Sequence, residues 1–529
     1  MTEFDFLSGR RPSTYGTGGM VATSHALASS AGLAILAQGG NAVDAAIAAS
    51  AVQCVVDPHM TGIGGDCFVL YAPKDGPVRA LNGSGRAPAG ATLAALSARG
   101  VTALEQTSVH AITIPGAVSA WCRLHADHGR LPLSDVLAAA IHYAEDGFAI
   151  STRVAADFAN YANDLRGDVH AAAMFLPGDQ LPTPGDILRQ PELAQRFREV
   201  GERGAAAFYQ GENAAKMARH LQSLGGLHTE KDFHDATDGA DWQEPISASY
   251  RGHELLECGP NGQGLAALLI LKILEGFDMG PEVPLANRVH LQAEATKLAY
   301  HHRDALIADP AHCEGLAERL LSDDAIATLR ARIRMDRATP PTLWDEPEHK
   351  DTIYLCVVDG EGNAVSFINS IFHAFGSTRL CPETGVLFHS RGASFRLIEG
   401  HPNCIAPGKR PMHTIIPGIL RGEGRIMPFG VMGGHYQAAG QAAFVSAVVD
   451  RGMDLQAAMD EPRSFAFDGE LQVERTMPEE VVQDLAARGH KIKRLPRPMG
   501  GSQAIRLDLA TGLRTGASDS RKDGMAIGF

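Results

Sequence analysis

The pattern of apolar and polar residues predicts alternating helices and strands in the first part of the chain. Residues 27–38 form an alanine- and leucine-rich segment that ends at a Gly-Gly pair, which is typical of a helix and its C-terminal cap. Asn41 then stands at the N-cap position of a second helix, predicted over residues 42–55. Beyond a glycine-rich turn, the β-branched and aromatic residues of 67–71 and 78–81 predict two paired strands.

The middle of the chain has a different pattern. Residues 130–335 are mainly helical by periodicity, as in 292–306 and 316–335, and a Pro-Asn-Gly-Gln-Gly cluster at 260–264 interrupts them. Residues 338–350 hold two adjacent prolines, a third proline and mixed charges, which fit neither helix nor strand. We therefore predict a linker there.

Two β-rich runs directly after this linker predict a hairpin. Residues 352–358 and 364–369 flank the turn sequence Asp-Gly-Glu-Gly-Asn. If the loop is symmetric about Glu361, Thr352 faces Ser370 across the pair of strands. Opposed Cβ atoms lie ~4.5–5.5 Å apart, close enough for two hydroxyls to hydrogen-bond. A shift of one residue would place a neighbour of Ser370 there instead, so the pattern alone leaves the register open.

Charge and composition narrow the classes of function. The chain has 529 residues, of which 45% are hydrophobic, and a formal net charge of −14, which predicts a globular protein without a nucleic-acid or anionic-membrane partner. The N-terminal segment lacks the basic and apolar regions of a signal peptide, and the eight cysteines form no CxxC pair. We therefore expect a reduced, cytoplasmic protein.

Several common catalytic motifs are missing from the sequence. It has no GxxxxGK[ST] phosphate loop, no GxGxxG turn after a predicted strand, no HExxH pair and no GxSxG elbow. We therefore expect neither a bound cofactor nor a metal ion in the site.

Thr352 suggests a different chemistry, because it begins a strand after a linker. A threonine hydroxyl is a weak nucleophile and needs a base. If the bond before Thr352 were cut, the new α-amine, with an ordinary pKa of ~7.7–8.0, could take the hydroxyl proton. Taken alone, Thr352 fits better as an ordinary β-branched residue that starts a strand, because threonine is common in strands.

Blocks of sequence along nearly the whole chain resemble the gamma-glutamyltranspeptidase family. The block at 351–365 resembles the start of that family's small subunit, whose nucleophile is the threonine matching Thr352. Other matching blocks lie at 39–46, 62–65, 114–116, 375–376, 408–411, 432–434 and 519–524.

This resemblance implies the fold and the processing. The fold would be α+β, the four-layer αββα sandwich of the N-terminal-nucleophile hydrolases. One precursor would cut itself between Asp351 and Thr352 into a helix-rich large chain (1–351), contributing half of the sandwich, and a small chain (352–529). These chains would stay together, and the resemblance allows a dimer of such heterodimers. Ser370 falls where the family keeps a threonine bonded to the nucleophile, and Gly433 and Gly434 match its oxyanion glycines.

The positions that hold a donor's amino acid group in that family differ here. Ser84, Phe372, Arg391, Ser394 and the pair His413-Thr414 stand at those positions, so the anchors for an α-ammonium are missing. Arg391 is the candidate to hold a carboxylate, with His413, Thr414, Phe372 and Arg86 as further substrate-binding candidates. Arg391 could instead be paired with a structural acid, and His413 could be a structural histidine.

These departures predict the substrate class. The pattern looks like the transpeptidase-like amidases, including oxamate amidohydrolases, and predicts hydrolysis of a small anionic amide such as oxamate. Two alternatives remain at this stage. One is a glutathione hydrolase or gamma-glutamyltransferase whose donor contacts come from other residues, and the other is an uncleaved, inactive relative.

Overall fold

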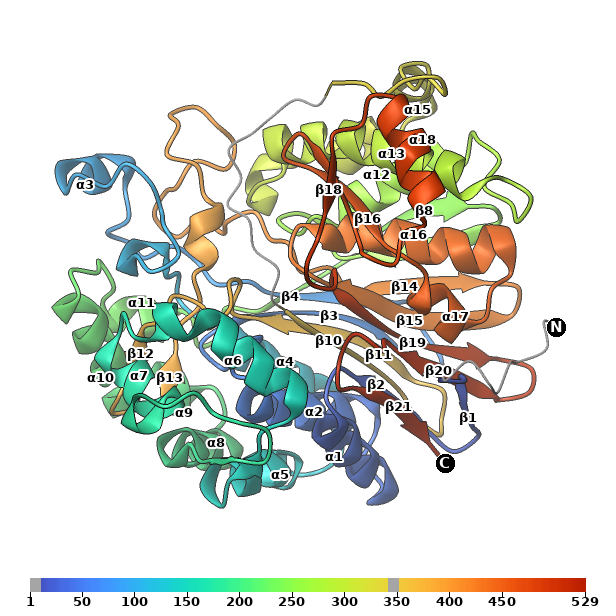
Figure 1. Cartoon of the computed structure of the whole chain (residues 1–529). Coiled ribbons are helices and arrows are strands. Elements are labelled where there is room, and N and C mark those ends of the chain that lie inside the picture. Colours follow the sequence, from blue (N-terminus) through green and yellow to red (C-terminus); the bar gives the residue numbers. More distant parts are fainter. Residues whose placement is uncertain (1–10, 341–351) are drawn as a thin grey trace.

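The computed structural model describes residues 11–340 and 352–529, which form four layers. Two seven-stranded sheets lie face to face, and helices cover the outer face of each (Figure 1). All strand pairs of these two sheets in the described residues are antiparallel. No helix among the described residues is long and apolar enough to cross a membrane.

The strands of each sheet come from distant parts of the chain. The first sheet has the order β1 (Thr14–Gly16), β20 (Arg514–Ser518), β19 (Gly501–Asp508), β15 (Arg425–Met432), β14 (Gly418–Gly422), β9 (His253–Glu257) and β8 (Ile246–Tyr250). The second has the order β21 (Met525–Gly528), β2 (Met20–Thr23), β10 (Ile353–Val358), β11 (Ala364–Ser370), β3 (Asp66–Ala72), β4 (Arg79–Gly83) and β7 (Asp241–Gln243).

Each sheet has its own helical cover. Helices α1 (Ala26–Ala37) and α2 (Ala42–Val56) pack on β2, β10 and β11, and α12 (Gly264–Leu274) and α16 (Tyr436–Arg451) pack on β8, β9 and β15, with α13 (Leu285–Leu306) behind them. The remaining helices are α3 (Leu93–Ala98), α4 (Ala117–His128), α5 (Leu133–Glu145), α6 (Thr152–Leu165), α7 (Val169–Phe175), α8 (Pro191–Arg203), α9 (Ala206–Tyr209), α10 (Gly211–Ser223), α11 (Glu230–Asp235), α14 (Leu316–Leu320), α15 (Asp323–Arg330), α17 (Leu455–Asp460) and α18 (Glu479–Ala487). Small sheets add β5 (Phe148–Ala149) with β6 (Ile187–Leu188), β12 (Leu380–Cys381) with β13 (Val386–Leu387), and β16 (Ser464–Phe467) with β17 (Glu470–Val473) and β18 (Ile492–Arg494).

The start of α2 follows the predicted cap. The Asn41 side-chain oxygen accepts hydrogen bonds from the N–H groups of Val43 and Asp44, and the Asp44 carboxylate accepts one from the Asn41 N–H. This reciprocal arrangement satisfies backbone donors that a helix start otherwise leaves unpaired. The predicted helices at 27–38 and 42–55 are confirmed to within one residue at either end.

The register of the β10–β11 hairpin is also confirmed. Ile353 lies opposite Asn369, so one further step along the strands places Thr352 opposite Ser370. Only residues 338–340 of the predicted linker belong to the part of the chain that the structure describes; its other residues, and Asp351, lie outside it.

One prediction for the middle of the chain is wrong. The expected helix over 316–335 is two helices, α14 and α15, because the Ser322 hydroxyl accepts the Ala325 N–H and starts a new helix. The prediction that 130–335 is mainly helical is confirmed, since most of these residues lie in the helices from α5 to α15, but the pattern did not indicate β7, β8 and β9. All three strands are short, β7 and β8 are edge strands, and β8 alternates exposed and half-buried residues, so it has little apolar signal.

Segments from both sides of position 352 contribute to both sheets. Before 352, the described residues supply three strands of the first sheet and four of the second, and the later residues supply the others. Between the sheets, the Tyr354 ring lies against Gly430, where a Cβ atom would collide with it. The Ser366 hydroxyl bonds to both the Tyr354 hydroxyl and the Phe429 carbonyl oxygen across the same interface. Buried residues from both segments, such as Val69 before and Phe367 after position 352, belong to one apolar cluster, so the two segments share one core.

Candidate functional site

Thr352 lies directly before β10, next to the end of β11. Its side chain is buried, and its Oγ1 is 3.1 Å from the Ser370 Oγ. The Phe372 N–H donates a 3.0 Å hydrogen bond to the same Ser370 Oγ. This second bond fixes the serine hydroxyl at the position from which it contacts the threonine.

Gly433 and Gly434 form the turn between β15 and α16. Both have positive φ angles, +120° and +59°, and a Cβ atom on Gly433 would lie 2.9 Å from the Gly500 Cα. Their carbonyl oxygens accept the N–H groups of Tyr436 and Gln437 in the first turn of α16. This turn therefore requires glycine, and it sits at the positive end of a helix dipole, which favours a negative charge.

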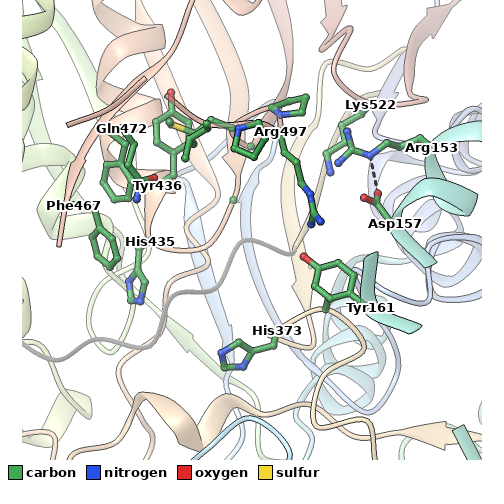
Figure 2. Close-up of a pocket in the computed structure, with 18 of the residues that line it drawn as sticks. Arg153, Asp157, Tyr161, His373, His435, Tyr436, Phe467, Gln472, Arg497 and Lys522 are labelled. Carbon is green, nitrogen blue, oxygen red and sulfur yellow. Dashed lines mark hydrogen bonds and ion pairs between the residues drawn. The ribbon is translucent and has the colours of Figure 1, made fainter. Parts of the chain in front are cut away.

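A cavity of about 380 Å³ lies beside this turn (Figure 2). Gly433, Gly500 and His373 are part of its wall, and His373 follows Phe372 in sequence. The cavity wall thus includes the residue that follows Phe372, whose N–H is bonded to Ser370.

Arg391 occupies a short 3-10 helix and is fully buried. Its guanidinium carbon lies 4.0 Å from the centre of the Phe372 ring, and its Nη1 donates a 3.1 Å hydrogen bond to the Thr414 Oγ1. Its Nε and Nη2 have no hydrogen-bond partner among the described residues. Burial lowers the Arg391 pKa to about 9, and the Asp66 carboxylate opposes this shift. A buried cation with unused donors is costly, and a bound carboxylate would relieve that cost.

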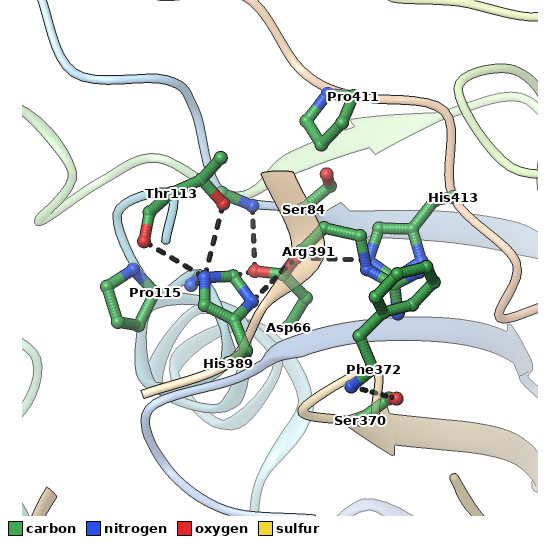
Figure 3. A network of polar contacts seen from close by, with 12 residues as sticks. Asp66, Ser84, Thr113, Pro115, Ser370, Phe372, His389, Arg391, Pro411 and His413 are labelled. Carbon is green, nitrogen blue, oxygen red and sulfur yellow. Dashed lines mark hydrogen bonds and ion pairs between the residues drawn. The ribbon is translucent and has the colours of Figure 1, made fainter. Parts of the chain in front are cut away.

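Asp66 is the centre of a buried network next to Arg391 (Figure 3). Its carboxylate accepts hydrogen bonds from the N–H groups of Gly85 at 2.9 Å and Gly116 at 3.2 Å. The His413 Nε2 lies 3.0 Å from it, and the His389 Nδ1 lies 3.5 Å away on the other side. Although burial alone would raise the pKa of Asp66, the two histidines hold it well below its usual range.

His413 uses both ring nitrogens inside the protein. Its Nε2 bonds to Asp66, and its Nδ1 accepts the Ile415 N–H at 3.4 Å. Burial and the Arg391 charge lower the His413 pKa to about 3, so the ring is neutral at ordinary pH. This geometry makes His413 a residue that orients Asp66.

A single buried amide connects the Arg391 side of the site to the glycine turn. The Gln263 Nε2 donates to the Thr414 carbonyl oxygen at 2.7 Å and to the Gly434 carbonyl oxygen at 3.1 Å. The structure thus brings together eight of the residues singled out from the sequence: Thr352, Ser370, Phe372, Arg391, His413, Thr414, Gly433 and Gly434.

Arg86 is placed elsewhere. It is exposed, lies 3.6 and 3.9 Å from the carboxylates of Asp241 and Asp309, and donates to the Gly408 carbonyl oxygen. The structure therefore engages Arg86 in surface contacts and does not join it to the Arg391 cluster.

Asp66 and Gln263 were not identified from the sequence. Asp66 follows the glycine-rich turn at 62–65 as the first residue of an otherwise apolar strand, and Gln263 lies in the 260–264 cluster. Both residues could have been noticed in the sequence, because each is a polar residue that stands between a glycine-rich turn and a buried element.

Among the described residues, one cluster has the composition of a metal site. His290, Glu294 and His490 place one ligand atom each within 4.8 Å of the others. The His290 Nδ1 is instead hydrogen-bonded to the His490 Nε2 at 2.8 Å, and the Lys297 ammonium is paired with the Glu294 carboxylate. The Lys297 ammonium thus already supplies a positive charge to the Glu294 carboxylate, and the two histidines share a proton. The cluster joins α13 to the loop after α18 and does not include Thr352.

Comparison with known proteins decides the family. A family model described as Gamma-glutamyltranspeptidase matches residues 28–529. The chain belongs to this family. The "Glutathione hydrolase-like YwrD proenzyme" of Bacillus subtilis is 36% identical over 531 residues, 98% of this chain and 99% of that protein. The "Oxamate amidohydrolase proenzyme" of Klebsiella pneumoniae is 36% identical over 538 residues, with the same two coverages.

Solved structures agree with this assignment. The crystal structure of a cephalosporin acylase from Bacillus halodurans has a TM-score of 0.92 and 37% identity, covering 100% of this chain and 99% of that one. The αββα fold class and the family membership predicted from the sequence are confirmed. The chain is an N-terminal-nucleophile amidohydrolase of the gamma-glutamyltranspeptidase family.

Proposed function

We propose that this precursor cuts its own chain between Asp351 and Thr352 and then hydrolyses a small carboxylate-bearing amide such as oxamate. The names of the relatives describe proenzymes, in keeping with a processed precursor. Residues 1–351 would form the large chain and residues 352–529 the small chain. The eight cysteines are all unpaired, which suits a reducing compartment such as the cytoplasm.

The reaction needs only groups of the processed site. The freed α-amine of Thr352 takes the proton from Oγ1, and Oγ1 attacks the amide carbonyl carbon. Backbone N–H groups of the turn at Gly433 and Gly434 stabilise the negative charge on the carbonyl oxygen. The C–N bond then breaks, the amine leaves with the proton, and water hydrolyses the resulting ester to release the acid and restore Thr352.

The surroundings of the Arg391 side chain are the observation that supports a carboxylate-bearing substrate. Its guanidinium is buried against Phe372, whose N–H holds Ser370, and two of its nitrogens lack partners among the described residues. A short acyl group attached to Thr352 and ending in a carboxylate would supply the missing acceptor. The nearest acid, Asp66, is already held by two backbone N–H groups and by His413, so it is poorly placed to bind a substrate ammonium.

Kinetics with oxamate test this proposal. Wild-type processed protein should release ammonia from oxamate, and Arg391→Lys should lower kcat/KM at least about tenfold, mainly through KM, because lysine cannot form the bidentate contact. The matched control is Arg421→Lys on the exposed end of β14, which should keep wild-type kinetics.

The alternatives make different predictions in the same assay. Turnover of a γ-glutamyl anilide without turnover of oxamate would favour a glutathione hydrolase, the name of a Bacillus subtilis relative that is 30% identical. A single uncut chain that is inert toward both compounds would indicate an inactive relative.

A further inference from the structure

Gln263 is hydrogen-bonded to both halves of the candidate site. It is fully buried and lies directly before α12. Its main-chain N–H donates to the His413 carbonyl oxygen at 2.8 Å, and its Nε2 donates to the Thr414 and Gly434 carbonyl oxygens at 2.7 and 3.1 Å. Because one nitrogen bonds to both of these carbonyl oxygens, they lie no more than about 6 Å apart.

The partners of Gln263 leave its side-chain amide one orientation. Carbonyl oxygens only accept hydrogen bonds, so the atom that faces Thr414 and Gly434 is the donating nitrogen. On the other side, the Arg303 Nη1, which only donates, lies 2.9 Å from the Gln263 Oε1. An inverted amide would place a donor against a donor and an acceptor against two acceptors, so the group is fixed.

Arg303 is itself held in place by α13. Its guanidinium is buried, lies 4.0 Å from the centre of the Tyr300 ring and donates from Nε to the Asp304 carboxylate at 2.5 Å. Its Nη1 also lies 2.9 Å from the His435 Nδ1, and the Tyr300 hydroxyl donates to the His435 carbonyl oxygen. Helix α13 therefore supports the glycine turn through both Gln263 and His435.

The two groups that Gln263 joins have different tasks in the proposed reaction. Thr414 accepts a hydrogen bond from Arg391, which is assigned to the substrate carboxylate, and Gly434 belongs to the turn assigned to the carbonyl oxygen. A substrate must reach both groups at once, with its reacting carbon beside Thr352. Each added methylene group inserts one more carbon–carbon bond of about 1.5 Å, whereas a misplacement of about 1 Å can cost about 100-fold in rate. A rigid connection between the two groups therefore favours one acyl length.

We propose that Gln263 is a positioning residue that sets the acyl length, because it fixes the separation between the carboxylate-binding Arg391 and the oxyanion turn. This inference rests on the function proposed above and deepens it, since it explains how the site distinguishes oxamate from its longer homologues. In this role Gln263 acts through Thr414 and Gly434 and not by contact with the substrate.

Three monoamides of dicarboxylic acids test the inference: oxamate, malonamate and succinamate, which differ only in the number of methylene groups. Processed wild-type protein should cleave oxamate with a kcat/KM at least about tenfold above that for malonamate, and succinamate should be poorer still. Because the three amides also differ in intrinsic reactivity, the informative quantity is the change in this ratio between wild type and variant. The ratio does not depend on the fraction of active protein, so incomplete processing cannot distort it.

Gln263→Met removes both donated hydrogen bonds at nearly the same side-chain length. It should lower kcat/KM for oxamate at least about tenfold and reduce the preference for oxamate over malonamate about fivefold or more. Arg303→Lys keeps the positive charge beside the amide, so it is a milder second variant that should reduce the preference about twofold. If Gln263→Met remains uncut, the ratio in Arg303→Lys decides.

The matched control is Gln190→Met. The Gln190 side chain is also buried, and its Nε2 donates to the carbonyl oxygen of Val55 on α2 at 2.9 Å. This variant loses a comparable buried hydrogen bond away from Thr414 and Gly434. It should therefore lose stability and keep the wild-type ratio.

Two outcomes would overturn the inference and leave the proposed function standing. One is a preference for oxamate that keeps its wild-type value in both variants, whether or not turnover falls on all three amides. The other is an equal loss of the preference in Gln190→Met. A wild type that prefers malonamate or succinamate, with a preference that Gln263→Met weakens, would support the inference and correct the acyl group of the proposed function. A wild type that is inert toward all three amides would refute the proposed function and the inference with it.

Discussion

The Ser370 hydroxyl is bonded to Thr352 on one side and to the Phe372 N–H on the other. Because these contacts are buried, removing the hydroxyl would delete both of these hydrogen bonds from the protein interior, at a cost in free energy. In the proposed mechanism, the serine would therefore hold the Thr352 hydroxyl in place both before and after the chain is cut.

Two substitutions at Ser370 distinguish the effect of its hydroxyl group from the effect of its side-chain packing. Ser370→Ala should slow processing and turnover about tenfold or more, whereas Ser370→Thr should stay close to wild type because it keeps the hydroxyl. A time course of precursor and product bands, followed by oxamate kinetics, measures both steps. Wild-type processing by the alanine variant would show that Ser370 does not act on Thr352.

The sequence could predict some residues of the site and not others. Thr352 and Ser370 followed from hairpin symmetry, because strand pairing has a fixed period. Arg391 and Phe372 were found by resemblance, but their ring contact depends on how two irregular segments fold over each other. Asp66 and Gln263 belong to no motif, and their importance comes only from partners that are distant in sequence.

Among the elements, the turn between β15 and α16 has the strictest geometry. Gly433 has a φ angle of +120° and Gly452, at the C-cap of the same helix, has +61°. A Cβ atom would meet the Gly500 backbone at the first position and open space at the second. Replacing either glycine by a residue with a side chain would therefore cost free energy because of the positive φ angle. Only at position 433 would the new Cβ atom also meet neighbouring backbone.

This difference gives a matched pair of variants. Gly452→Ala should lose about 1 kcal/mol of stability and keep full turnover of oxamate. Gly433→Ala should lose at least about tenfold in kcat, because displacing its backbone misplaces an N–H that stabilises the oxyanion in the proposed mechanism. Melting temperatures and kcat values for both variants check this, and equal kcat values would contradict the assigned role of the turn.

Elements with strong local signals were the ones predicted correctly. The capping box at Asn41 and the Gly-Gly stop after residue 38 define α1 and α2 from a few residues each. Ser322 carried a similar signal, but the surrounding apolar periodicity obscured it. β8 and β9 are held mainly by pairing with each other and, through β9, with β14, a partner more than 150 residues away, which local patterns do not report.

Across the whole molecule, interleaved strands hold the two proposed chains together. Residues on either side of position 352 pair within both sheets, and the terminal strands β1 and β21 pair with β20 and β2. Cutting before Thr352 breaks none of these pairings, so the products should remain one folded particle.

Stability of the whole molecule should fall on acidification before carboxylates titrate. Burial lowers the pKa of His228 to about 4 and of His373, His413 and His490 to about 3. Below the ordinary histidine pKa of ~6.5 the unfolded chain binds more protons than the folded one, so stability falls from about pH 6.5 down to about pH 3–4. Melting temperatures measured from pH 7.5 to pH 4 should therefore decline, and a flat profile over this window would contradict the neutral buried histidines.

The proposed break before Thr352 is measured directly by intact-mass analysis with N-terminal sequencing. Purified, active wild-type protein should contain two chains, residues 1–351 and 352–529, the second beginning at Thr352. Thr352→Ala should remain one chain of 529 residues and turn over no oxamate. An active wild-type sample that is continuous across positions 351 and 352, or an active alanine variant, would contradict the account.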